Sequence, residues 1–165
     1  MNTNKIIMGK RVLIVDDEKD ILETLTELLK LCKIDAASSF EEARVLLERY
    51  DYDLVVLDIM GVKGFELLEI ANTRHIPALM LTAHALTEES LTKSIKDGAS
   101  YFVPKHEMAQ IATYVADVLE AKEKNRNPWV RWFNRLGGSF DRIFTGPKWR
   151  EQEKEFLEKL RKTDW

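Results

Sequence analysis

Residues 11–18 read RVLIVDDE, in which four consecutive apolar residues, Val12–Val15, are followed at once by three carboxylates. A strand that is apolar at successive positions, rather than at alternate ones, is buried on both faces, as in a parallel sheet covered by helices. Two further runs have the same character, LVVL at Leu54–Leu57 and ALML at Ala78–Leu81. These three segments predict the central strands of one parallel sheet.

Amphipathic helical patterns separate these strands, and two weaker strands fit at Asp35–Ala37 and Tyr101–Val103. Ser39 precedes two glutamates, which is typical of a helix start, and Asp97-Gly98 ends the fourth helical pattern. The apolar positions at helical spacing are Ile21, Leu22, Leu25, Leu28 and Leu29, then Ala43, Leu46 and Leu47, then Phe65, Leu67, Leu68 and Ala71, then Leu91 and Ile95, then Met108, Ile111, Ala112, Val115 and Leu119. Five strand–helix repeats predict an α/β fold, a doubly wound five-stranded parallel sheet with helices on both faces.

The composition, 45% hydrophobic and 32% charged over 165 residues, is that of a globular domain with an appendage. Cys32 is the only cysteine, which excludes an internal disulfide and a multi-cysteine zinc site. The sequence has no run near the roughly 18 apolar residues of a membrane span and no signal peptide at its start. We therefore expect a cytoplasmic protein.

Polar side chains directly follow four of the predicted strands, at the end where ligands bind in doubly wound sheets. They are Asp16, Asp17 and Glu18 after the first strand, Asp58 after the third, Thr82 after the fourth and Lys105 after the fifth. Taken singly, an acidic pair after a strand commonly caps a helix, and a single lysine is commonly solvated. Their joint occurrence predicts that these carboxylates, the hydroxyl and the lysine converge on one edge of the sheet.

These residue types together suit phosphoryl transfer. Crowded carboxylates repel one another unless a cation lies between them, and Mg²⁺ prefers oxygen ligands. Asp58 stands alone at the end of its strand, which makes it the natural nucleophile toward a phosphoryl group. Lys105 and Mg²⁺ would offset the charge on the phosphoryl oxygens, and the Thr82 hydroxyl would donate to one of them.

Four segments resemble the signature segments of response-regulator receiver domains, and together they span about residues 10–121. They are VLIVDDE (12–18), LVVLDIM (54–60), ALMLTA (78–83) and GASYFVPK (98–105). The resemblance implies a flavodoxin-like sheet of order 2-1-3-4-5. It also implies that a histidine kinase or phosphotransfer protein phosphorylates Asp58, and that the chain has no enzyme activity beyond self-phosphorylation and autodephosphorylation.

The resemblance further implies the roles of individual residues. Mg²⁺ would be held by Asp16, Asp17, Asp58 and the backbone carbonyl of Met60. Lys105 would bind the phosphate, and Thr82 and Phe102 would report phosphorylation by rotating together. His84, two residues past Thr82, would border the phosphate and modulate its hydrolysis.

Three positions depart from the usual receiver pattern. The segment Asp58–Gly64 is two residues shorter than usual and has no proline. His106 stands where a proline usually follows the lysine, so the expected cis proline is absent. Phe102 replaces the commoner tyrosine, so a switch at this position must work by burial rather than by a hydroxyl hydrogen bond.

The chain divides at these patterns into an N-terminal tail (1–9), a receiver domain (10–121) and an amphipathic helical extension (122–165). Residues 1–121 carry 13 basic and 21 acidic side chains, a net charge of −8, whereas residues 122–165 carry 12 and 7, a net charge of +5.

The extension itself has a helical pattern. Asn127-Pro128 predicts a helix start. Apolar residues then recur at helical spacing at Trp129, Trp132, Phe133, Leu136, Phe140, Ile143 and Phe144. A final charged helix is expected over 148–162.

We expect this aromatic stripe to be buried on the receiver or on a second copy in a homodimer. A membrane-surface helix is an alternative, and DNA binding is disfavoured because the whole chain is acidic. Other functions also remain open. An aspartyl-nucleophile phosphatase of the haloacid-dehalogenase type would place a second aspartate where Met60 stands, and a flavodoxin-like cofactor binder would avoid acids after the first strand. A degenerate scaffold receiver is a further alternative.

Overall fold

The computed structural model describes residues 2–83 and 88–143, with the side chains of 88 and 138–143 left out. Five parallel strands form one sheet in the order β2-β1-β3-β4-β5. The strands are β1 (Arg11–Val15), β2 (Lys33–Ala37), β3 (Leu54–Asp58), β4 (Ala78–Thr82) and β5 (Tyr101–Pro104). The predicted α/β fold class and strand order are therefore confirmed.

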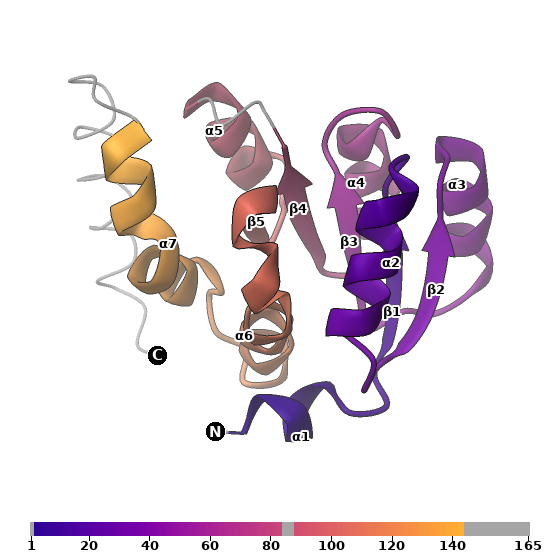
Figure 1. Ribbon diagram of the computed structural model, residues 1–165, viewed down its shortest axis with the longest axis horizontal. Helices are drawn as coiled ribbons and strands as arrows, with labels where there is room; N and C mark the ends of the chain where they lie inside the picture. Colours follow the sequence, from indigo (N-terminus) through magenta and orange to yellow (C-terminus); the bar gives the residue numbers. More distant parts are fainter. Residues whose placement is uncertain (1, 84–87, 144–165) are drawn as a thin grey trace.

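Helices cover both faces of the sheet, with α2 and α6 on one face and α3, α4 and α5 on the other (Figure 1). Their bounds are α1 (Thr3–Ile7), α2 (Lys19–Leu28), α3 (Phe40–Arg49), α4 (Gly64–Thr73), α5 (Glu88–Lys96), the 3₁₀ helix η1 (Lys105–Gln110), α6 (Ile111–Glu123) and α7 (Trp129–Ile143). None of the described helices is long and apolar enough to cross a membrane.

The apolar runs of the sequence become the core of this sandwich. Every residue of β3 and β4 is buried, because helices cover these central strands on both faces. The helix signals also hold: the Ser39 hydroxyl caps α3 by accepting a hydrogen bond from Glu42 N at 3.2 Å. Gly98, at φ 91°, follows α5 in the left-handed conformation that glycine adopts at low cost.

Strand ends differ from the sequence-based bounds in one way that matters for the site. β3 and β4 each continue one residue further, so that Asp58 pairs in register with Leu81 and Thr82 pairs with Pro104. Both polar residues thus belong to the strands themselves. Their positions are fixed by the sheet and not by flexible loops.

The N-terminal segment has more structure than the sequence indicates. Thr3–Ile7 form the short helix α1, whose first turn is capped by the Asn2 side chain, and α1 packs against α6. Ile7 is 1% exposed and belongs to the core. Five residues carry too little periodicity to predict a helix, and tertiary packing supplies its stability.

The helical extension continues the sheet layer at its β5 edge, where α7 lies beside β5 (Figure 1). The Asn127 side chain accepts a hydrogen bond from Trp129 N at 3.0 Å, which confirms the predicted helix start. Trp129, Trp132 and Leu136 are buried against the receiver. The receiver is one of the two surfaces on which we expected the aromatic stripe to be buried. The side chains of Phe140, Ile143 and Phe144 and the expected helix over 148–162 lie outside the described part of the chain.

Ile7→Ala is expected to lower the free energy of unfolding by about 2–3 kcal/mol, because it removes a fully buried side chain and leaves a cavity between α1 and α6. Chemical denaturation monitored by circular dichroism measures the change. Met8→Ala is the matched control, since Met8 is 61% exposed. Equal, small effects of both substitutions would show that α1 does not contribute to the core.

Candidate functional site at the carboxyl edge of the sheet

The ends of β1, β3 and β5 bring an ammonium group between acidic side chains. Lys105 Nζ lies 2.9 Å from Asp16 Oδ2, 3.4 Å from Glu18 Oε1 and 3.5 Å from Asp58 Oδ1. These contacts join residues that are up to 89 positions apart in the chain. The predicted convergence of the strand ends is confirmed for these four residues.

Asp16, Asp17 and Glu18 form a cluster of oxygen ligands. One carboxylate oxygen of each lies within 4.8 Å of the others, with Asp16 buried and the other two exposed. Glu18 N donates to Asp16 Oδ1 at 2.9 Å, which holds the buried carboxylate in place. Such an all-oxygen cluster fits a hard cation such as Mg²⁺. The sequence pattern predicts Glu18 at this edge but does not single it out as a metal ligand.

Burial changes the protonation of the two inner carboxyls. Burial, and then repulsion by Asp16, raise the pKa of Asp58 to about 7, although the charge of Lys105 acts in the opposite direction. Burial also raises the pKa of Asp16, against a backbone hydrogen bond from Glu18 and the contact with Lys105. Asp58 is only 3% exposed. The edge therefore has an excess of negative charge that one lysine does not neutralise.

Lys105 is held in its charged form by the same neighbours. Burial alone would lower its pKa, but the hydrogen bond to Asp16 and the attraction of Asp58, Asp16 and Glu18 outweigh burial and raise this pKa. Its side chain is 10% exposed. The site thus combines a permanent positive charge with a carboxyl, Asp58, whose ionisation is sensitive to any added cation.

Thr82 supplies a polar atom that has no partner of its own. The residue is 1% exposed, and its Oγ1 has no hydrogen-bond partner among the described residues. A buried hydroxyl left unpaired costs about 1–3 kcal/mol. Thr82 is the last residue of β4, and Asp58 is the last residue of the neighbouring strand β3. A hydrogen-bond acceptor bound at this edge would therefore satisfy the Thr82 hydroxyl.

The shortened loop after β3 packs closely against the acidic residues. A Cβ added at Gly61, where φ is 80°, would lie 2.5 Å from Asp17 Oδ2, and a Cβ at Gly64 would lie 2.2 Å from the Asp58 carbonyl oxygen. Only glycine permits this approach. Met60 lies in the same loop with its residue 65% exposed, so its side chain faces outward.

The two remaining predicted residues have different outcomes. Phe102 is fully buried on β5 and pairs in register with Met80 on β4. Its carbonyl accepts a hydrogen bond from Trp132 Nε1 of α7 at 2.7 Å, a contact that the sequence pattern does not predict. His84 lies outside the described residues.

A sequence model of the response regulator receiver domain family matches residues 12–116, which include all the residues of this edge and all five strands except Arg11, the first residue of β1. The chain belongs to this family. Response regulator receiver domains are signalling modules of two-component systems, so the alternatives of another fold family, a haloacid dehalogenase or a flavodoxin-like cofactor binder, no longer apply.

Relatives from plants and bacteria share the receiver. The two-component response regulator ARR18 of Arabidopsis thaliana is 35% identical over 108 residues, which cover 62% of this chain and 17% of that protein. The response regulator protein FleR of Pseudomonas aeruginosa is 30% identical over 115 residues, 66% of this chain and 24% of that protein. The chain thus spans a quarter or less of the length of these relatives.

Solved receiver domains have the same architecture. A CheY-like response regulator receiver domain protein from Methanospirillum hungatei JF-1 superimposes with a TM-score of 0.65 at 27% identity, over 71% of this chain and 98% of that one. The BeF3-activated DrrB receiver domain gives a TM-score of 0.61 at 28% identity, over 68% of this chain and 99% of that one. These superpositions cover most of the receiver but leave over a quarter of this chain unmatched.

Asp58→Asn is expected to stabilise the metal-free receiver more at about pH 8 than at about pH 5. Because the folded-state pKa of about 7 lies above the ordinary value of 3.8, the folded state binds this proton more tightly than the unfolded state does. The free energy of unfolding of the parent chain therefore falls as the pH rises between these two values, and the asparagine amide does not titrate.

Thermal melts in EDTA at both pH values measure this difference. Asp51→Asn is the control, because the Asp51 side chain is 97% exposed and pairs with Arg74 rather than with a residue of this edge. An equal gain for Asp58→Asn at both pH values would show that the Asp58 carboxyl is not perturbed.

Proposed function

We propose that this chain is a phospho-accepting response regulator, in which Asp58 takes a phosphoryl group from a histidine kinase or a phosphotransfer protein. The observation that carries the proposal is the contact of Lys105 with both Asp16 and Asp58, at an edge that also holds the unpartnered Thr82 hydroxyl. A nucleophile, a fixed positive charge and a free donor thus face the same space. Family membership supports the same function.

Asp58 is the nucleophile in this mechanism. One of its carboxylate oxygens forms a bond to phosphorus as the phosphorus–nitrogen bond to the donor imidazole breaks, and the leaving imidazole takes up a proton. A pKa of about 7 leaves a large fraction of Asp58 ionised near neutral pH, and any added positive charge increases this fraction. Catalysis is then mainly positioning and charge stabilisation.

Mg²⁺ fits the acidic cluster. Asp16, Asp17 and Asp58, with the backbone carbonyl of Met60, would hold the ion, and Glu18 is close enough to contribute. Bound Mg²⁺ supplies positive charge that offsets the charge on the phosphoryl oxygens. The close packing of Gly61 on Asp17 keeps the loop that carries Met60 next to these carboxylates.

Lys105 and Thr82 would bind the transferred group. The Lys105 ammonium group, which contacts Asp16, Glu18 and Asp58 in the unphosphorylated chain, would pair with one phosphoryl oxygen. The Thr82 hydroxyl would donate to another phosphoryl oxygen and so gain the hydrogen-bond partner that it lacks. Phe102, buried on β5 beside Met80 of β4, is the residue that would move with Thr82. His84 remains a proposed modulator of hydrolysis.

The observed contacts favour this function over a degenerate scaffold, because the nucleophile, lysine and hydroxyl are all present and converge. Trp129 and Trp132 are buried within the chain, which favours an intramolecular role for α7 over a homodimer contact or a membrane-surface helix. DNA binding by α7 is disfavoured for the same reason. A cytoplasmic location, where a histidine kinase could reach Asp58, is part of the proposal.

Incubation with a small phosphodonor and Mg²⁺ should label Asp58, as a mass increase of one phosphoryl group that is stable in acid, labile in base and not formed when EDTA removes Mg²⁺. Asp58→Asn should abolish the labelling, since the asparagine amide is not a nucleophile toward phosphorus, whereas the exposed control Asp51→Asn should label normally. Lys105→Ala should still label but should show a smaller conformational response. Intact-protein mass spectrometry measures these outcomes, and labelling of the Asp58→Asn chain would contradict the assignment.

A further inference from the structure

A pocket of about 330 Å³ lies at the amino ends of β4 and β5, at the opposite end of these strands from Asp58. Its size is that of a small-molecule site. Its walls come from the turn before β4, the turn before β5 and the end of α6 with its connection to α7, within residues 72–77, 98–100 and 118–128. The five residues of β4 separate this amino-edge pocket from the acidic edge by roughly 15 Å. A ligand in the pocket would therefore not overlap the proposed phosphorylation site.

The charged side chains of the amino-edge pocket are all basic. His75, Lys122 and Arg126 line it, and none of the described residues that line it is acidic. Asp97 lies next to one wall, but its carboxylate is 2.9 Å from Lys93 Nζ. Lys122 and Arg126 thus bring two permanent positive charges to one concave surface, which attracts anions.

Hydrogen bonds hold the walls of the pocket together on the receiver side. Lys122 Nζ donates to the His75 carbonyl at 2.9 Å, which joins α6 to the turn before β4. Asn72 Nδ2 donates to the Asp97 carbonyl at 2.6 Å, which joins α4 to the turn before β5. A Cβ added at Gly98 would lie 2.8 Å from Asn72 Nδ2, so these two walls meet closely.

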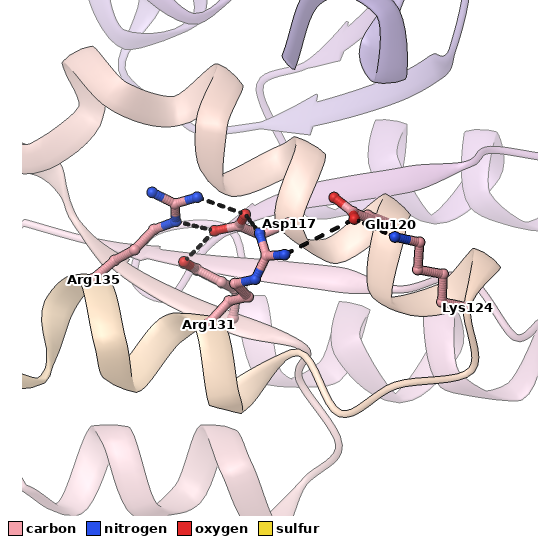
Figure 2. A network of polar contacts seen from close by, with 6 residues as sticks. Asp117, Glu120, Lys124, Arg131 and Arg135 are labelled. Carbon is pink, nitrogen blue, oxygen red and sulfur yellow. Dashed lines mark hydrogen bonds and ion pairs between the residues drawn. The ribbon is translucent and has the colours of Figure 1, made fainter. Parts of the chain in front are cut away.

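The wall formed by the α6–α7 connection is fixed by contacts at both of its ends. Trp129, the first residue of α7, donates from Nε1 to the Ala99 carbonyl at 3.0 Å. Figure 2 shows Asp117 of α6 between two arginines of α7, with Arg135 Nε at 2.5 Å, Arg135 Nη2 at 3.1 Å and Arg131 Nη1 at 3.4 Å from its carboxylate. The walls are thus in place before a ligand binds, and little ordering opposes binding.

A phosphate monoester matches this pocket in charge and in shape. Its charge of about −1.5 to −2 near neutral pH balances Lys122 and Arg126, whereas a carboxylate carries one charge. A guanidinium also binds two phosphate oxygens at once. Pro77 and Pro128 give the pocket an apolar lining, against which the organic group of an ester would pack.

We propose that the amino-edge pocket binds a small phosphate monoester through Lys122 and Arg126, with His75 as a third polar contact. This binding is separate from phosphoryl transfer to Asp58 and does not depend on it. The site requires the α6–α7 connection, because a receiver that ended at residue 121 would lack both cations.

An NMR titration of the full chain with phenyl phosphate and with inorganic phosphate, in EDTA and at constant ionic strength, tests the proposal. Amides of residues 72–76, 98–100 and 122–127 should shift saturably, and phenyl phosphate should bind at least about threefold more tightly than inorganic phosphate because its ring is buried. Shifts confined to residues 16–18, 58–61 and 105–106 would place the anion at the acidic edge and overturn the proposal, as would no saturable shift. Equal affinities would overturn the binding of an ester and leave a site for free phosphate.

Three substitutions that each remove one positive charge test the assigned contacts. Lys122→Gln and Arg126→Gln should each raise the dissociation constant of phenyl phosphate about fivefold or more. Arg126→Gln leaves the bond from Lys122 to the His75 carbonyl intact, so it separates lost charge from a displaced wall. Lys124→Gln is the matched control, because Lys124 pairs with Glu120 at 2.8 Å (Figure 2), and it should change the constant less than about twofold. Equal weakening by all three would show general attraction to a basic surface and would overturn the site.

Discussion

Two buried carboxyls, Asp16 and Asp58, share one ammonium group at the end of a parallel sheet, and the rest of the structure is arranged around this contact. Parallel strands place their carboxyl ends together, so residues from distant parts of the chain meet without a dedicated binding loop. Burial makes their charges costly. The site therefore favours any ligand that adds positive charge or that accepts a hydrogen bond from Thr82.

This constraint extends to both sides of the acidic edge. Toward solvent, the loop after β3 lies so close to Asp17 and Asp58 that only glycine fits at positions 61 and 64. Toward the end of the sheet, Lys105 begins η1 directly after β5, and the strand itself is attached to α7 through the Phe102 carbonyl. A short strand of four residues thus links the charged edge to the helical extension.

Most of the fold and of the site could be predicted from the sequence because their signals are local. Val12–Val15 and Leu54–Leu57 are apolar at successive positions, which occurs when both faces of a strand are covered, and the residue after each run then marks the edge. The contacts of α7 could not be predicted, because an amphipathic stripe shows that a helix is buried but not what covers it. A clue was present: Asp117 and Glu120 lie on α6, whose other buried residues are mostly apolar, and Arg131 and Arg135 follow at complementary spacing. α1 was missed because five residues carry no periodicity.

The covering of β5 by α7 also affects how the protein behaves at high concentration. A sheet of this kind has two terminal strands, and each presents backbone groups to which a strand of another molecule can add. At β5 the indoles of Trp129 and Trp132 occupy that side. At β2 the exposed Lys33, and Asp35 paired with Arg11 and the Tyr52 hydroxyl, place charged side chains along the strand. Both edge strands are thus protected from the addition of a strand of another molecule. α7 covers β5, and charged side chains protect β2.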